Sequence, residues 1–218
     1  MSSRLAPLVI VLIPLLLVAS TSAEEADFTP LFDGESFNGW EGNLDVFRIE
    51  EGAIIAGNAQ ASLAHNEFLC TKKIFRDFEL RLEAKLVGPG NNAGIQFRSS
   101  RIPNDPEVRG YQCDMGAAGD MGNIWGWLYD ESRRNKFLAQ SNLKNPEKYF
   151  REGDWNKFVI RCQGPRIQIW RNGKQTVDYL ERDEEISRHG IIGLQIHGGP
   201  PSEASYRKIR IRTLTSKK

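Results

Sequence analysis

The sequence predicts an all-β protein built as a two-sheet antiparallel β-sandwich. Short runs in which apolar and polar residues alternate recur along most of the chain, whereas helical periodicity is hard to find. Gly, Pro, Asn and Asp separate these runs, as they do between strands that are joined by turns. About ten strands at this spacing are typical of a sandwich or a jelly roll.

The chain begins with the pattern of a secretory signal peptide. Arg4 precedes an apolar run over residues 5–19, and the small residues 20–23 supply a cleavage site. The run is shorter than the ~20 residues of a membrane-spanning helix and contains prolines, which disfavours a retained anchor. We therefore expect a signal peptide over residues 1–23 and a single domain over residues 24–218 that is secreted or periplasmic.

The charge balance argues against a nucleic-acid partner. The whole chain carries 29 Lys and Arg residues and 28 Asp and Glu residues. Because the leader contains one arginine and no acid, the mature chain should be neutral. A neutral chain lacks the electrostatic attraction that supplies most non-specific affinity for nucleic acid, and no RNA-binding or zinc-finger motif is present.

Three cysteines, Cys70, Cys113 and Cys162, sit singly in apolar segments and never as C-x-x-C. This spacing fits neither a zinc site nor a redox pair. An oxidising compartment would permit one disulfide and one free thiol, but buried cysteines without a partner are the favoured interpretation.

The strand over residues 78–85 shows the alternation most clearly. Its apolar and charged side chains fall on opposite faces, with Phe78, Leu80, Leu82 and Ala84 on one and Glu79, Arg81, Glu83 and Lys85 on the other. The glycine-rich segment 88–92 then breaks the chain.

Further strands follow over residues 158–162, 167–169 and 208–212. Asn172-Gly173 predicts a type I′ hairpin, because both central residues of that turn need positive φ. Gly164-Pro165 marks the turn before it. In contrast, residues 132–149 are polar and poorly periodic, which predicts a long surface loop.

Familiar catalytic motifs are absent, among them the serine hydrolase elbow, the P-loop, the zincin motif and the EF-hand loop. What remains is a set of polar side chains at alternate strand positions: Gln96, Arg98, Gln112, Asp114, Gln195 and His197. If their strands are neighbours in one sheet, these side chains converge. Together they suit a polyhydroxyl ligand, because each hydroxyl both donates and accepts hydrogen bonds. The alternative is an ordinary solvated face of the sandwich.

His197 ends a strand beside a Gly-Gly-Pro turn, which favours a functional role, whereas His65 and His189 flank turn-like stretches and should lie on the surface. Trp125, Trp127 and Tyr129 could stack on a sugar ring or form the buried face of their strand, and the pattern leaves both open.

Glu79 and Glu83 invite comparison with the paired carboxylates of glycosidases. Four residues of strand span about 13 Å, whereas a retaining pair needs about 5 to 5.5 Å and an inverting pair about 6.5 to 9.5 Å. The two cannot form that dyad, although Glu83 alone could still join the polar set.

In order and spacing, these segments resemble the 3-keto-disaccharide hydrolase domain family over nearly the whole mature chain. The matching segments are Leu31-Phe32-Asp33-Gly34, Gly39-Trp40, Asp77-Phe78-Glu79-Leu80, Asn92-Ala93-Gly94-Ile95, Phe97-Arg98, Tyr111-Gln112-Cys113-Asp114, Asp154-Trp155-Asn156, Asn172-Gly173 and Gly190-Ile191-Ile192-Gly193-Leu194-Gln195-Ile196-His197-Gly198. The resemblance implies a concanavalin-like jelly roll with a concave ligand-binding sheet. The sequence departs from the pattern expected of the family at Ala93 and Cys113. The loop over residues 116–120 could also reshape the site.

The resemblance also implies a chemistry: a ketone at C3 of a sugar acidifies the proton on C2, so a base can remove it and the C1 substituent is eliminated before water adds. Asp114 or His197 would be the base. Arg98, or a divalent metal ion held by Glu83, Asp114 and His197, would stabilise the enolate. Substrate contacts would come from Asn92, Gln96, Gln112, Gln195, Trp125, Trp127 and Tyr129.

Two other functions remain open. The same fold serves lectins, so the chain could be a noncatalytic carbohydrate-binding module. It could also be an interaction domain of the cell surface, in which case a broad apolar area and no pocket are expected.

Overall fold

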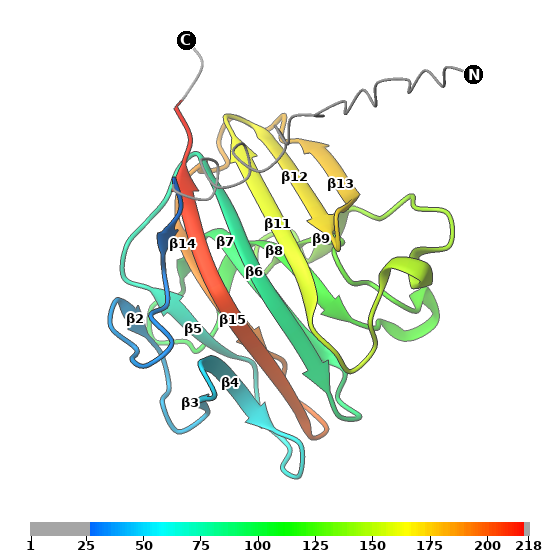
Figure 1. Cartoon of the computed structure of the whole chain (residues 1–218). Coiled ribbons are helices and arrows are strands. Elements are labelled where there is room, and N and C mark those ends of the chain that lie inside the picture. The colour runs from blue at the N-terminus through cyan, green and yellow to red at the C-terminus, as the bar shows by residue number, and fades with distance from the viewer. Residues whose placement is uncertain (1–26, 216–218) are drawn as a thin grey trace, which may run out of the picture.

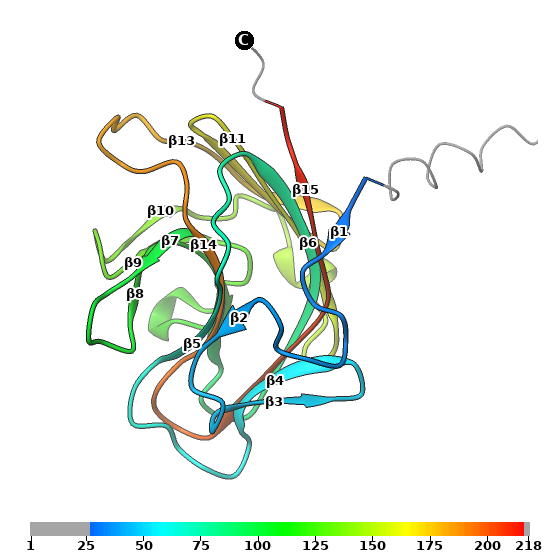
Figure 2. The ribbon, with the colours of Figure 1, turned by 90° about the vertical axis from the view of Figure 1, so that its left-hand side faces the viewer.

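The computed structural model describes residues 27–215, so the predicted signal peptide lies outside the described residues and stays a prediction. The described chain forms two antiparallel sheets packed face to face, which confirms the predicted β-sandwich (Figure 1). Seen from the side, the sheets form two separate layers (Figure 2). Among residues 27–215, no helix is long and apolar enough to cross a bilayer.

Sheet A has the strand order β13-β12-β11-β6-β15-β4-β3, and β1 pairs with β15. Its strands are β1 (Thr29–Pro30), β3 (Phe47–Glu50), β4 (Ala53–Asn58), β6 (Phe78–Val87), β11 (Asn156–Gln163), β12 (Arg166–Arg171), β13 (Lys174–Leu180) and β15 (Ser202–Thr213).

Sheet B has the order β10-β9-β8-β7-β14-β5-β2. Its strands are β2 (Trp40–Glu41), β5 (Glu67–Thr71), β7 (Asn92–Arg101), β8 (Val108–Gly116), β9 (Leu128–Glu131), β10 (Lys136–Ala139) and β14 (Ile191–Ile196). Two short 3₁₀ helices, η1 (Gly119–Met121) and η2 (Pro146–Tyr149), lie in the connections.

The alternation read from the sequence decides which face of each strand is buried. Leu80 and Leu82 of β6 pack in the core against Phe158 and Ile160 of β11, and Ile95 of β7 supplies part of the opposite layer. The type I′ hairpin is confirmed: Asn172 and Gly173 join β12 to β13 with φ of 48° and 77°. The three cysteines are free and buried, as the sequence favoured.

The predicted long loop over residues 132–149 is only partly right. The segment contains β10, which forms a hairpin with β9, and η2. Phe137 explains the extra strand, because its ring packs edge-on against Trp127 and Tyr129, with ring centroids 5.3 and 5.1 Å apart. One aromatic residue in a polar segment thus fixes a strand that the weak periodicity did not reveal.

Candidate functional site

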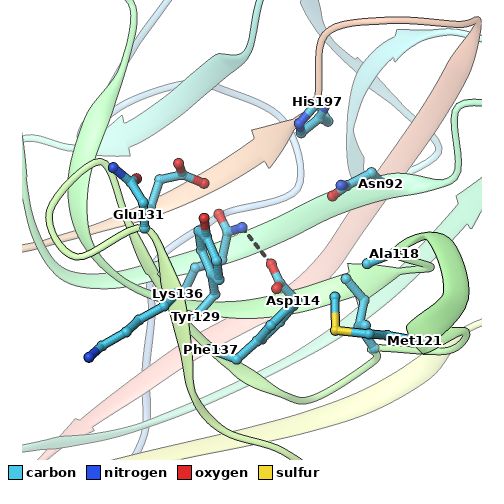
Figure 3. A pocket seen from close by; sticks show the side chains of 12 residues that line it. Asn92, Asp114, Ala118, Met121, Tyr129, Glu131, Lys136, Phe137 and His197 are labelled. Atoms are coloured by element: carbon cyan, nitrogen blue, oxygen red, sulfur yellow. Dashed lines mark hydrogen bonds between the residues drawn. The ribbon is translucent and has the colours of Figure 1, made fainter.

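A cavity of about 480 Å³ opens on the face of sheet B that points away from the core (Figure 3). Its floor comes from the neighbouring strands β7, β8 and β14, and its walls come from the β9–β10 hairpin and the loop that contains η1. The lining residues are Asn92, Gln112, Asp114, Ala118, Met121, Ile124, Tyr129, Glu131, Asn135, Lys136, Phe137 and His197.

Asp114 is the carboxyl at the floor of this cavity. It lies on β8 opposite Gly94 of β7, and only 4% of its surface is exposed. The Gln112 side-chain amide donates a hydrogen bond to its Oδ1 atom at 2.5 Å. Burial nevertheless raises the pKa of Asp114 to about 8, because a low-dielectric environment penalises the charged form, and the charge of Glu131 adds to the effect. At neutral pH the carboxyl is therefore mostly protonated.

A chain of buried hydrogen bonds holds Gln112 in place. Ser99 Oγ donates to Gln96 Oε1 at 2.8 Å, and Gln96 Nε2 donates to Gln112 Oε1 at 2.6 Å. Because Gln112 accepts through its oxygen, its amide nitrogen must face Asp114. Gly94 leaves room for this arrangement, since a Cβ atom there would lie 2.4 Å from Gln112 Cδ.

His197 follows the last residue of β14 and is exposed at the cavity. Its Nδ1 atom lies 2.5 Å from the carbonyl oxygen of Gly198. A carbonyl oxygen can only accept, so Nδ1 carries the hydrogen of this bond. In the neutral imidazole the lone pair is then on Nε2, which makes that atom the basic one.

Glu131, at the end of β9, lines the cavity but was not among the residues selected from the sequence. Gln195 Nε2 donates to its Oε2 atom at 3.4 Å. Burial raises the pKa of Glu131, the charge of Glu107 raises it further, and His197 acts in the opposite direction. One signal could have found Glu131: it stands two residues after Tyr129 and so shares its face of the strand.

Residues 27–212 match the family of 3-keto-alpha-glucoside-1,2-lyase-like domains. The chain belongs to this family. This confirms the resemblance read from the sequence and places the protein among glycosyl hydrolase-like proteins.

Individual relatives agree with this placement. A 3-keto-disaccharide hydrolase of Bacteroides thetaiotaomicron is 23% identical over 86% of this chain and 78% of its own length. A candidate glycosyl hydrolase from Parabacteroides distasonis shares the fold with a TM-score of 0.65 and 18% identity, over 91% of this chain and 99% of its own. The carbohydrate binding module CBM66 from Bacillus subtilis has a TM-score of 0.58 and 14% identity, over 80% and 96% of the two chains.

Two charged residues selected from the sequence do not reach the cavity of this 3-keto-alpha-glucoside-1,2-lyase-like domain. Glu83 lies on β6 in sheet A, where Arg207 Nε and Lys208 Nζ contact its carboxylate at 2.8 and 3.0 Å. The expectation that Glu83 joins Asp114 and His197 is wrong, because β6 belongs to sheet A whereas β8 and β14 belong to sheet B. The proposed metal ligand set therefore does not assemble, and no three candidate ligand residues gather within residues 27–215.

Arg98 is the second correction. A bulge in β7 between Phe97 and Ser100, with Arg98 at φ 46°, interrupts the alternation on which its placement relied. The buried guanidinium donates instead to Asp77 Oδ1 at 2.9 Å and to the Gly164 carbonyl at 2.8 Å. It ties β7 to the β11–β12 turn and does not line the cavity.

The remaining amide and aromatic residues selected from the sequence differ in whether they line the cavity or lie buried beneath it. Gln96 and Gln195 are fully buried beneath the lining residues, whereas Asn92, Gln112 and Tyr129 line the cavity. Trp125 belongs to the core and stacks on Phe158, because the turn at Gly126, with φ 81°, takes it off the Tyr129 face. Trp127 packs against Phe137, a lining residue. His65 and His189 are exposed, as predicted, and neither lines the cavity, although His65 lies against Gly198, the residue after His197.

Proposed function

We propose that this cavity hydrolyses 3-keto-glycosides by elimination and hydration. The observation that carries the proposal is a buried, mostly protonated carboxyl, Asp114, in the same cavity as His197, whose Nε2 is free, in a chain of the 3-keto-alpha-glucoside-1,2-lyase-like family. Carbohydrate-binding proteins of the same fold support a sugar ligand.

The reaction consists of two balanced steps. A base takes the C2 proton, the C–H electron pair forms an enolate with the C3 ketone, and the enolate expels the C1 oxygen, which leaves as the alcohol after it gains a proton. Water then adds to C1 and a proton returns to C2. The net change is glycoside plus water to 3-keto-sugar plus alcohol.

The side chains of the cavity suit distinct parts of this reaction. Nε2 of His197 is the base, because its lone pair is free. Protonated Asp114 donates a hydrogen bond to the developing enolate oxygen, as a neutral carboxylic acid can in a buried site. Glu131 is the other carboxyl that lines the cavity, and it supplies the proton to the leaving alcohol. Asn92 and Gln112 supply amides for the sugar hydroxyls.

The test is release of alcohol from 3-keto-glucosides by the purified protein, with and without divalent cations. We expect Asp114→Ala, which removes the hydrogen-bond donor, and His197→Ala, which removes the base, to lower kcat/KM by about 10²- to 10⁴-fold. His189→Ala, which removes an exposed histidine outside the cavity, should leave turnover unchanged. In D₂O, elimination and hydration should place deuterium at C2 of the product.

Sugar binding without turnover would point to a noncatalytic carbohydrate-binding module. Turnover without deuterium at C2 would exclude the elimination route and leave a direct displacement at C1.

A further inference from the structure

The cavity has two chemically different sides (Figure 3). Asn92, Glu131 and His197 surround Asp114 on one side. The loop that contains η1 lines the other side with apolar side chains, namely Ala118, Met121 and Ile124. The hairpin wall carries the polar side chains of Tyr129, Asn135 and Lys136 beside Phe137. The η1 loop is therefore the part of the lining whose side chains offer a sugar no hydrogen-bond partner.

Among the apolar residues that line the cavity, Met121 is unusually exposed to solvent. It is 49% exposed and is one of four large hydrophobic side chains in the described chain that are exposed to this degree. The other three, Leu44, Ile74 and Leu180, do not line this cavity. An exposed apolar side chain in a binding cavity gains free energy when a ligand removes it from water.

The loop that carries Met121 has a defined shape. It runs from β8 to β9, and Ala117 and Asn123 pair across its base as an isolated bridge. The Ala118 amide donates to the Gly122 carbonyl at 3.0 Å, and the Met121 amide donates to the Ala118 carbonyl at 2.9 Å. Because β8 also carries Asp114, the same strand places both the reacting carboxyl and the apolar side.

We infer that the site takes 3-keto-glycosides whose aglycone is apolar, an alkyl or aryl group rather than a second sugar. This rests on the proposed function, which puts the 3-keto ring against Asp114 and His197, and it places the C1 substituent against Met121 and Ile124 of the η1 loop. A second sugar there would lose water from its hydroxyls without gaining hydrogen bonds. Methionine adapts to ligands of different shape, so aglycones of several shapes fit.

The test compares hexyl and methyl 3-keto-glucosides of the same anomer, because the two alcohols leave with similar ease and differ in apolar surface. We expect kcat/KM to be at least about tenfold higher for the hexyl compound. Met121→Gln, which keeps the length of the side chain, should reduce this ratio toward one. Ile74→Gln, at an exposed hydrophobe outside the cavity, should leave the ratio unchanged.

A binding measurement separates this inference from the proposed reaction. Calorimetric titration with unoxidised hexyl and methyl glucosides needs no turnover. Tighter binding of the hexyl compound that Met121→Gln abolishes would support the apolar side even if no 3-keto-glucoside is hydrolysed. A 3-keto-disaccharide turned over faster than the hexyl compound, or a hexyl preference that survives Met121→Gln, would overturn the inference.

Discussion

Asp114 is buried, and the hydrogen bond that it accepts from Gln112 offsets only part of the cost of burying its charge. Gln112 favours the carboxylate, but burial penalises it more, so the pKa of Asp114 rises to about 8. A carboxyl of this kind can donate a hydrogen bond at neutral pH and cannot do so once it ionises.

Activity should therefore fall on the alkaline side. If protonated Asp114 holds the enolate oxygen, kcat/KM should decrease as pH rises through about 8, because this parameter reports groups of the free enzyme. The measurement is a pH profile of kcat/KM with a 3-keto-glucoside. An increase through the same range would instead identify Asp114 as the base.

The same carboxyl should make stability depend on pH. Its pKa is raised from 3.8 to about 8 on folding, so between these values the folded state binds more protons than the unfolded state. Stability then falls as pH rises through that window. We expect Asp114→Asn to be more stable than the wild type by at least about 1 kcal/mol at pH 9, and this gain to shrink at pH 4. Urea unfolding at the two pH values checks it, and an equal effect at both would contradict it.

Gln96 should act on the site without touching its ligand. It is fully buried and reaches Asp114 only through Gln112. In Gln96→Met the amide of Gln112 loses the donor that orients it, so the hydrogen bond to Asp114 weakens. The pKa of Asp114 should rise further, moving the alkaline limb of kcat/KM to higher pH, and kcat should fall about tenfold. Gln168→Met on sheet A is the matched control, and an unshifted limb would contradict the role.

At the scale of elements, the β9–β10 hairpin is the part of the site that depends most on a polar network. Arg134 in the hairpin donates to Asp130 and, at 2.6 Å, to Glu181 Oε2. Tyr111 of β8 donates to the same Glu181 oxygen at 2.7 Å. These bonds anchor the turn between Glu131 and Lys136, both of which line the cavity.

Loss of this anchor should loosen the cavity wall. In Arg134→Met we expect KM to rise several-fold and the free energy of unfolding to fall by about 1–3 kcal/mol, because buried acceptors lose a charged donor. Arg166→Met is the control, since its ion pair with Asp178 is exposed and should contribute little. Kinetics together with urea unfolding checks both effects, and equal losses in the two variants would contradict the anchor.

Low pH should weaken the interactions of Glu181 with Arg134 and Tyr111. Burial alone would raise the pKa of Glu181, but the bonds from Arg134 and Tyr111 lower it to about 2, below the usual 4.5. The resulting stabilisation is fully present above pH 4.5 and is lost as pH falls through about 2.

For the whole molecule, Tyr206 links the two layers beneath the site. It belongs to β15 of sheet A, and its hydroxyl lies 2.5 Å from the Gln195 carbonyl and 3.2 Å from the Gly94 carbonyl of sheet B. Gln195 and Gly94 are register partners of β14 and β7, the strands that carry His197 and Asn92 at their ends. This side chain therefore bridges the two layers under the cavity.

Removing the Tyr206 hydroxyl should lower the stability of the folded protein and leave the packing of the core unchanged. Tyr206→Phe keeps the ring in the core, and we expect the free energy of unfolding to fall by about 1 kcal/mol, the usual contribution of a buried hydrogen bond. Tyr149→Phe, at a half-buried position in η2, serves as the control in urea unfolding. A value for Tyr206→Phe indistinguishable from the control would show that the hydroxyl does not link the layers.

Local sequence patterns are enough to predict the fold class, the faces of the regular strands and the Asn172-Gly173 hairpin. Each of these depends on local rules: a strand alternates with period two, and a type I′ turn needs residues that tolerate positive φ. The same rule placed Gln112 and Asp114 together on the outer face of β8.

Tertiary contacts set which strands are neighbours and where the alternation breaks, and neither could be predicted from the sequence. Glu83 has the expected parity but belongs to the other sheet, and the bulge at Arg98 turns that side chain away from the cavity. Glu131 joins the site because β9 pairs with β8. Sheet pairing joins residues far apart in sequence, and a bulge depends on both partner strands, so neither follows from the period of one strand alone.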